Sequence, residues 1–537
     1  YTASNQLHFR ISYMHTLFLD IKISLSLSLS LSLSLCATMA NSEVNHKPHA
    51  IFIPYPLQGH VIPSVHLAIK LASRGFTITF INTHSIHHQT SKAQTNNTGD
   101  DIFSGVHESG LDIRYTTVSD GLPVEFDRSL NHDQFMAALL HVFSAHVDEM
   151  VGKIVRSAQP RVCCLIADTF FVWPSIIAKK FGLSYISFWT EPALVFTLYY
   201  HLDLLQENGH FGSHDIRTEA ISYIPGVQSI EPKDMMSYLQ ETDTSSVCHQ
   251  IVFKAFQDAR GADFVLCNTV EELEVETISA LQAQMPFYAI GPIFPSGFQK
   301  SIVSTSLWSE SDCTQWLNNK PKGSVLYVSF GSYAHVTHRD LVEIANGLSL
   351  SKVYFVWILR ADIVSSDCVN PLPVGYNEEV GNRAMIIPWC SQIAVLTNPA
   401  IGGFLTHCGW NSILESIWCK TPLLCFPLLT DQFTNRKLVV DDWKIGSNLS
   451  NRMPITKEEV SENINSLMSG KARDEYMKAI GQVREKLENA TTPKGSSEQN
   501  MDSFIKDLKA RTQPCELTKN LQSARTCNSN PRTQTHM

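Results

Sequence analysis

Apolar segments alternate with helix-like segments from residue 49 onward, and this pattern predicts an α/β fold. The order strand, helix, strand occurs twice in the first 190 residues, over 49–56, 61–73 and 76–83, and again over 161–168, 173–181 and 182–190. The strand segments are almost continuously apolar, which is typical of parallel strands buried on both faces. We therefore expect βαβ units and a parallel sheet in the first half of the chain.

A second α/β series begins after residue 311. Apolar strands are expected at 323–332, 354–360, 384–389 and 400–409, with a helix over 410–418 directly after the last of them. The Ser- and Pro-containing segment between the two series, 294–311, has the composition of a linker. Because single cores stop growing at roughly 250 to 300 residues, the 537 residues of the chain predict two domains with a cleft between them.

The same pattern sets the domain boundaries. We expect residues 47–293 to form the first domain and 312–490 the second. Charged amphipathic helices follow residue 456, and we expect 491–512 to be a C-terminal helix that packs back on the first domain. Residues 513–537 are polar and without periodicity, so we expect a disordered tail.

The first 46 residues are interpreted separately, because 24–35 is a low-complexity run of Ser-Leu pairs. A secretory segment is one interpretation, since Ala37, Thr38 and Ala40 are small residues suited to a cleavage site. The other is translated upstream sequence with the native start at Met39, because a TC repeat read in frame encodes Ser-Leu pairs. We favour the second interpretation and expect residues 1–46 to be a disordered leader.

Charge and cysteine content exclude some classes of function. The net charge is -9, from 42 Lys and Arg against 51 Asp and Glu, which argues against a nucleic-acid partner or a polybasic membrane patch. The leader is too polar for a spanning helix, so no integral membrane segment is expected. The 13 Cys are odd in number, and their spacing does not fit a zinc site, so we expect no metal. Several Cys lie inside apolar strands, which favours a reducing, cytoplasmic location.

Candidate chemistry lies where predicted strands end. In open parallel sheets, ligands bind at the carboxyl ends of the strands. His60 follows the first strand, while Asp168 and Thr190 end two later ones. These three side chains are therefore candidates for one site in the first half.

The stretch 389–432 carries the most chemistry. A loop of small residues opens the helix at 410–418, where free N–H groups and the helix dipole suit a phosphate. His407 and Ser412 add side-chain donors, and Glu415 lies one turn further on, where it could accept from ribose hydroxyls. Asp431 and Gln432 supply the acceptor and donor mix that recognises a sugar.

This stretch resembles the 44-residue signature box of the plant family 1 UDP-glycosyltransferases. The matching positions are Trp389, Gln392, His407, Cys408, Gly409, Trp410, Asn411, Ser412, Glu415, Pro422, Pro427, Asp431 and Gln432. The resemblance extends over 48–512, through "PLQGH", "NTVEELE", "SVLYVSFGS" and "FVWILR". It implies a GT-B fold, that is, two Rossmann-like parallel-sheet domains facing a cleft, with the acceptor bound by the N-terminal domain and the UDP-sugar by the C-terminal domain.

The resemblance also implies roles for individual residues. Trp389 would stack on uracil and the Cys390 backbone would bond its edge, while Gln392 and Glu415 would hold ribose. The diphosphate would be held by Ser332, His407, Asn411 and Ser412, and the hexose by Thr190, Trp410, Asp431 and Gln432. The terminal Gln is similar to that of glucose-preferring members, which favours UDP-glucose as donor. The chain departs from the family pattern at Cys390, Ser391, Asn398 and Lys420; if the turn at Lys420 needs a positive φ, about 1 kcal/mol of strain follows.

The expected reaction is transfer of a hexose with inversion, with His60 as the general base and Asp168 on its other ring nitrogen. The helix start and His407 would stabilise the leaving diphosphate, so we expect no metal and no cofactor besides the donor. An idle UDP-sugar or metabolite-binding relative is the alternative. A Rossmann dehydrogenase is disfavoured, because neither half has G-x-G-x-x-G after its first strand.

The acceptor is expected to be a small hydroxylated molecule, of the plant secondary metabolite or hormone type. Its pocket should be built by long N-domain loops at 85–110 and 194–216, which do not identify it further. We expect the protein to be a monomer.

Overall fold

The computed structural model describes residues 47–94, 101–107, 109–212, 217–295, 298, 303, 305–364 and 371–512. The described residues from Pro48 onward belong to one structural unit. The expectations of a leader over 1–46 and a tail over 513–537 lie outside the described residues.

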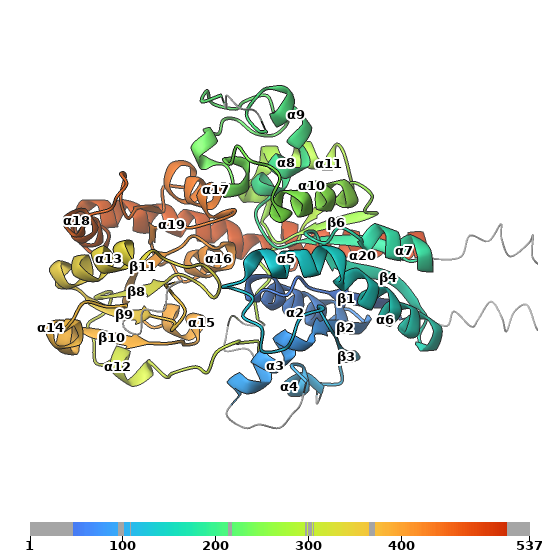
Figure 1. Cartoon of the computed structure of the whole chain (residues 1–537), viewed down its shortest axis with the longest axis horizontal. Helices are drawn as coiled ribbons and strands as arrows, with labels where there is room; N and C mark the ends of the chain where they lie inside the picture. Colours follow the sequence, from blue (N-terminus) through green and yellow to red (C-terminus); the bar gives the residue numbers. More distant parts are fainter. Residues whose placement is uncertain are drawn as a thin grey trace, which may run out of the picture. The chain divides into compact units, whose positions relative to one another are not determined.

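The first half of this unit is built on a parallel sheet of seven strands (Figure 1). Their order is β3-β2-β1-β4-β5-β6-β7, and every neighbouring pair is parallel. The strands are β1 (His49–Ile53), β2 (Thr77–Thr83), β3 (Ile113–Val118), β4 (Val162–Asp168), β5 (Ser184–Trp189), β6 (Phe264–Cys267) and β7 (Phe287–Ala289). Strand order reverses between β1 and β4, and in open sheets ligands bind outside such a reversal.

The second half repeats this design with six strands, in the order β10-β9-β8-β11-β12-β13, again all parallel. The strands are β8 (Val325–Ser329), β9 (Tyr354–Ile358), β10 (Ala384–Ile387), β11 (Ile401–Thr406), β12 (Leu423–Cys425) and β13 (Gly446–Asn448). The expectation of two Rossmann-like parallel sheets is confirmed.

The central strands, such as β1 and β8, are largely apolar because hydrophobic clusters lie on both faces of each sheet. In β1, Ala50 and Phe52 belong to one hydrophobic cluster, while Ile51 and Ile53 belong to the cluster on the opposite face. In β8, Leu326 and Val325 divide between two clusters in the same way. Successive side chains of a strand point to opposite faces, so each strand needs apolar residues at every position.

Nineteen α-helices lie in the described residues. Those of the first half are α2 (Gln58–Ser73), α3 (His84–Ala93), α4 (Ser104–His107), α5 (His132–His141), α6 (Phe143–Ser157), α7 (Pro174–Phe181), α8 (Ala193–Tyr200), α9 (Leu202–Glu207), α10 (Val247–Ala259) and α11 (Val275–Gln282). Those that follow are α12 (Thr314–Asn318), α13 (His338–Ser351), α14 (Tyr376–Val380), α15 (Gln392–Leu396), α16 (Trp410–Trp418), α17 (Gln432–Lys437), α18 (Lys457–Met468), α19 (Gly470–Ala490) and α20 (Ser496–Thr512).

Helix α2 begins earlier than its apolar pattern predicts, at Gln58 and not at 61. The Leu57 carbonyl accepts hydrogen bonds from the N–H groups of His60 and Val61, both at 2.9 Å. The first turn carries polar residues and a glycine, so apolar spacing gave no signal for it. His60 therefore lies in the first turn of a helix, where its backbone is fixed.

Helix α20 ends the described chain but packs on the first sheet (Figure 1). Met501, Phe504 and Leu508 join the hydrophobic cluster of β1, and the rings of Phe504 and Phe264 meet edge to face at 5.7 Å. Lys70 on α2 pairs with Glu498 at 2.6 Å. The helix starts at Ser496, because 491–495 forms the turn after α19.

Candidate functional site

A pocket of about 680 Å³ is lined by residues from the carboxyl ends of both sheets and from the starts of α2 and α16. Twelve of the fourteen residues predicted for the site line it: His60, Thr190, Ser332, Trp389, Cys390, Gln392, His407, Trp410, Asn411, Ser412, Glu415 and Asp431. The remaining two, Asp168 and Gln432, lie behind lining residues. The structure thus brings nearly the whole predicted set to one place.

His60 and Asp168 form a pair beside this pocket, although 108 positions separate them in the sequence. His60 Nδ1 lies 2.7 Å from Asp168 Oδ2 and 3.0 Å from Thr190 Oγ1. The Asp168 side chain is 1% exposed, and its Oδ1 accepts from the Phe170 N–H at 3.0 Å. Both contacts to the ring use Nδ1, so the ring is oriented with Nε2 as the atom that a substrate can approach.

Aromatic rings enclose the imidazole. The centroids of Tyr55 and Phe170 lie 5.5 and 5.8 Å from that of His60. The side chain of His60 is 14% exposed. These two rings pack against the imidazole and restrict its movement.

His407 lies in the part of the pocket lining that comes from the second sheet, at the turn between β11 and α16. Burial lowers its pKa to about 4, with a further contribution from the positive charge of Arg360. The imidazole is therefore neutral at pH 7. A Cβ added to Gly331 or Gly409 would lie 2.5 or 2.6 Å from His407 Nε2, so only glycine fits at either position. The ring is held between two glycines, where backbone N–H groups can approach a ligand closely.

Arg360 fixes the loop that carries Gly331. The guanidinium is 1% exposed and donates to the carbonyl of Gly331, to that of Ala334 at 2.8 Å and to Asp362 Oδ1 at 2.9 Å. Arg360 was not among the residues predicted for the site. Its signal was a charged side chain at the end of the otherwise apolar segment 354–360.

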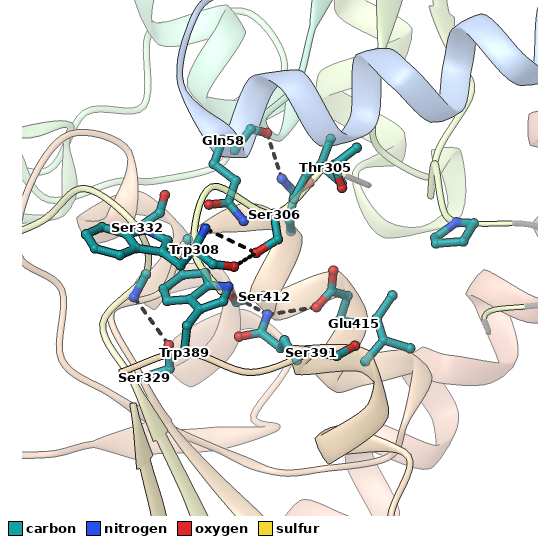
Figure 2. A pocket seen from close by; sticks show the side chains of 18 of the residues that line it. Gln58, Thr305, Ser306, Trp308, Ser329, Ser332, Trp389, Ser391, Ser412 and Glu415 are labelled. Carbon is teal, nitrogen blue, oxygen red and sulfur yellow. Dashed lines mark hydrogen bonds between the residues drawn. The ribbon is translucent and has the colours of Figure 1, made fainter. Parts of the chain in front are cut away.

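Gln392, Ser412 and Glu415 form a connected polar group; Figure 2 labels Ser412 and Glu415. Gln392 Nε2 donates to Glu415 Oε2 at 2.7 Å and to Ser412 Oγ at 3.1 Å, and its Oε1 accepts from Tyr327 at 3.3 Å. Burial raises the pKa of Glu415 to about 7, against the lowering effect of the Gln392 hydrogen bond. These side chains present acceptors and donors toward the pocket, as hydroxyl recognition requires.

Trp389 faces a second indole that the sequence analysis did not predict (Figure 2). The ring of Trp308 lies 6.1 Å from that of Trp389, with 31° between the planes. Among the described residues, Trp308 Nε1 is buried without a hydrogen-bond partner. Trp308 belongs to the segment 294–311, which the sequence predicts as a linker only. Described residues of that segment line the pocket, namely Phe294, Pro295, Val303, Thr305, Ser306, Trp308 and Glu310. Linker composition carried no signal for this role.

Trp410 and Asn411 contact the other half of the unit. Trp410 Nε1 donates to the Asn268 carbonyl at 2.7 Å, and Asn411 Nδ2 donates to the Gly59 carbonyl at 2.7 Å. Gly59 precedes His60, so Asn411 ties the start of α16 to the helix turn that carries the imidazole.

Asp431 is buried at the pocket wall, where it accepts from Thr430 Oγ1 at 2.8 Å and from Asn435 Nδ2 at 2.5 Å. Burial raises its pKa. Gln432 lies behind it, and its Oε1 accepts from the N–H groups of Leu428 and Leu429 at 2.9 and 3.1 Å. Gln432 therefore stabilises the loop at Leu428 and Leu429, because its amide oxygen accepts both of these hydrogen bonds.

Within the described part of the chain, no three His, Cys, Asp or Glu side chains are grouped as metal ligands. None of the helices described has the length and hydropathy required to cross a bilayer.

Both halves of the chain match known protein families. Residues 49–295 match the family described as "Glycosyltransferase, N-terminal domain", and 228–485 match "UDP-glucoronosyl and UDP-glucosyl transferase". UDP-glycosyltransferase 86A2 of Arabidopsis thaliana is 62% identical over 471 residues, which cover 87% of this chain and 96% of that protein.

Solved structures of similar fold carry ligands. Medicago truncatula UGT71G1 complexed with UDP-glucose is 25% identical, with a TM-score of 0.72 and coverage of 87% of this chain and 99% of that one. Phytolacca americana UGT2 complexed with UDP-2fluoro-glucose and pterostilbene is also 25% identical, with a TM-score of 0.70 and coverage of 86% and 99%. With two parallel Rossmann-like domains, the signature box at a shared pocket and these matches over both halves, the chain belongs to the plant family 1 UDP-glycosyltransferases of GT-B fold.

Proposed function

We propose that this enzyme transfers glucose from UDP-glucose, with inversion, to a hydroxyl group of a small plant metabolite. One observation carries the proposal. The His60–Asp168 pair, at 2.7 Å, lies beside the pocket that also contains the signature box, so a base and a nucleotide-sugar site share one space. The same contact favours an enzyme over an idle relative.

His60 would act as the general base. Asp168 holds Nδ1, so Nε2 takes the proton of the acceptor hydroxyl as its oxygen attacks C1 of the hexose. The bond between C1 and the diphosphate oxygen breaks, and UDP leaves with that electron pair. Attack from the face opposite UDP inverts the anomeric carbon. The buried Asp168 carboxylate stabilises the imidazolium that forms.

The leaving diphosphate would be stabilised at the start of α16. Backbone N–H groups at this helix start have no partner among the described residues, the helix dipole is positive there, and the neutral His407 ring lies beside Gly409. Ser332, Asn411 and Ser412 lie at the same part of the pocket. We propose that these donors stand in place of a divalent metal, so that transfer continues in EDTA.

The nucleoside would lie against Trp389, with Gln392 and Glu415 at ribose. Thr190, Trp410 and Asp431 would line the hexose position, with Gln432 holding the loop behind it. Glucose as the transferred sugar is supported by the UDP-glucose and UDP-2fluoro-glucose that the two solved relatives bind.

The acceptor would be small, hydroxylated and at least partly apolar. Apolar side chains of the pocket lining, among them Ile62, Ile293 and Phe294, favour such a molecule. Pterostilbene, bound by Phytolacca americana UGT2, is an acceptor of this kind to test first.

We further propose a cytoplasmic location. The nine described cysteines are all free thiols, and most are buried in apolar surroundings, which fits a reducing compartment. The expectation of a monomer stays a prediction that light scattering can check.

The test is UDP release from UDP-glucose with a panel of phenolic and terpenoid acceptors, with products identified by mass spectrometry. His60→Ala should lower kcat by at least about 100-fold, because a positioned general base typically contributes that much. UDP affinity should stay unchanged. His141→Ala, at an exposed histidine of α5, is the matched control and should retain full turnover.

Two results would contradict the proposal. Retained turnover in His60→Ala would remove the base assignment. Tight UDP binding without turnover of any donor and acceptor pair would favour the idle relative.

A further inference from the structure

A chain of hydrogen bonds between side chains joins the two halves of the unit beside the pocket. Tyr333 lies in the loop between β8 and α13, in the second half, and His132 is the first residue of α5, in the first half. The phenolic oxygen of Tyr333 lies 2.6 Å from His132 Nδ1, and its O–H donates to the Arg128 carbonyl at 3.1 Å. These contacts span 201 and 205 positions of the sequence.

The donors in this chain follow from the chemistry of its groups. Burial lowers the pKa of His132, so the imidazole is neutral at pH 7 and carries one N–H. The Tyr333 O–H is used at the Arg128 carbonyl, so the N–H is on Nδ1 and donates to the Tyr333 oxygen. Nε2 is then an acceptor, and Cys248 Sγ and the Tyr238 hydroxyl lie 3.2 and 3.4 Å from it. Both ring nitrogens and the phenol therefore have partners, and such a satisfied network is rigid.

The first-half end of this chain is held by a buried ion pair. The Arg128 side chain is 8% exposed and donates to both carboxylate oxygens of Asp120, at 2.8 and 3.0 Å. It also donates to the carbonyls of Phe126 and Pro123, at 2.8 and 3.1 Å. The carbonyl that accepts from Tyr333 therefore belongs to a segment that the first half fixes by itself.

The second-half end is part of the pocket wall. Tyr333 directly follows Gly331 and Ser332, which both line the pocket. Arg360 donates to the carbonyls of Gly331 and Ala334, on either side of Ser332 and Tyr333. Arg360 thus fixes this loop, 330–337, to the second half, while Tyr333 fixes it to the first.

Tyr333 also lies near the residues that surround the base. Burial raises the pKa of Tyr55, and the neighbouring acidic groups of Asp168, Cys248 and Tyr333 add to this effect. The Tyr55 ring packs against that of His60, with 5.5 Å between the centroids. The contact between the two halves is therefore made close to both the base and the loop of Ser332.

We propose that Tyr333 is a positioning residue for the transfer: its hydroxyl, held by His132 and Arg128, sets the position of the loop 330–337 relative to His60. The inference rests on the proposed function, in which Ser332 of this loop binds the donor and His60 activates the acceptor. Transfer requires C1 of the hexose and the attacking oxygen to be nearly in contact, and a displacement of about 1 Å can lower the rate by about 100-fold. UDP binding itself does not depend on the contact, because Arg360 holds the loop within the second half.

The experiment compares Tyr333→Phe with the wild type. Phenylalanine keeps the ring but removes the oxygen, which takes the donor from the Arg128 carbonyl and the acceptor from His132 Nδ1. The kcat is measured by UDP release from UDP-glucose, with the phenolic acceptor of the panel that the wild type turns over fastest. It should fall by about tenfold, whereas the Kd of UDP, measured by calorimetry, should stay within about twofold.

Tyr354→Phe is the matched control, because Tyr354 is a half-buried tyrosine of β9 outside the described pocket lining. It should keep both the kcat and the Kd of the wild type. A thermal melt verifies that each variant folds.

His132 provides the partner variants. His132→Ala should lower kcat as Tyr333→Phe does, and the double variant should be no slower than the slower single variant, because both changes remove one contact. His132→Asn keeps an N–H donor near the position of Nδ1, so its kcat should stay within about threefold of the wild type. Loss of folded protein alone would not produce this rescue.

Each failure has its own signature. If Tyr333→Phe keeps the wild-type kcat, or if the two losses multiply in the double variant, Tyr333 does not position the loop and the inference is wrong. A parallel loss of UDP affinity and kcat in Tyr333→Phe would place its effect within the second half and would also overturn the inference. If the wild type turns over no donor and acceptor pair, it is the proposed function that fails.

Discussion

The two walls of the pocket are built in different ways. The wall from the second sheet comes largely from one stretch, 389–432, whose polar side chains bond one another, as Gln392 does with Ser412 and Glu415. The wall from the first sheet is assembled from the ends of separate strands, as the pairing of His60 with Asp168 across 108 positions shows. Both walls hold a buried polar atom with no partner among the described residues, namely Glu191 Oε2 in the first and His407 Nδ1 in the second. The contiguous stretch of the second wall is preorganised, because its polar side chains already bond one another.

Among the substitutions proposed in the second-sheet wall, Gly331→Ala is expected to have the largest effect on UDP affinity. Gly331 has a φ of +74°, and a Cβ would lie 2.5 Å from His407 Nε2, so the imidazole must move. UDP affinity should fall by at least about tenfold, measured by calorimetry.

Gly375→Ala is the control for backbone strain alone. Gly375 has nearly the same φ, +73°, but nothing lies within 4 Å of the added Cβ. Gly375→Ala should lose about 1 kcal/mol of stability from backbone strain. Gly331→Ala should lose more because of the clash with His407, and only Gly331→Ala should lose UDP affinity. Equal UDP affinity in the two variants would show that the position of His407 between Gly331 and Gly409 does not affect UDP binding.

The pH dependence of stability provides a second test of the second-sheet wall, through Glu415. Glu415 has its pKa raised from 4.5 to about 7, so between these values the folded protein holds a proton that the unfolded chain has released. This group therefore stabilises the fold less as pH rises through that window. In Glu415→Gln, the decrease in Tm between pH 5 and pH 7.5 should be smaller than in the wild type by about 1 to 2 °C.

Glu475→Gln is the matched control for this titration, because the Glu475 side chain is 67% exposed on α19. Its decrease in Tm should equal that of the wild type. A Glu415→Gln decrease as large as the wild-type decrease would show that Glu415 does not carry the proton.

The smallest effect is expected at Lys420, which lies in the signature box but not among the described residues of the pocket lining. The φ of Lys420 is 55°, so this turn adopts the left-handed conformation. The strain that was predicted for a positive φ at this position therefore applies. Lys420→Gly should raise stability by about 1 kcal/mol, visible as a small increase in Tm, with turnover unchanged.

Lys478→Gly in the middle of α19 is the control of opposite sign, since glycine inside a helix destabilises by roughly 1 kcal/mol. If Lys420→Gly also lowered the Tm, the turn would not be strained by its lysine.

Much of the fold could be predicted from the sequence, because long apolar strands and a helix such as 410–418 have strong patterns. The short strands β7, β12 and β13 have only three residues each, too few to show a period, and they were not predicted. The start of α2 was missed because its first turn is polar. The role of Trp308 was missed because composition marks a linker but does not show what the linker contacts.

The family and the nucleotide wall could be assigned from the amino-acid sequence, because those residues are contiguous and their spacing is fixed by one turn and one helix. The contribution of the first sheet depends on tertiary packing. This packing brought His60 to Asp168 across 108 positions and bonded Asn411 to Gly59 across 352. These contacts depend on parallel strands ending at one sheet edge and on two halves meeting at one pocket. Such packing leaves no local pattern in the chain.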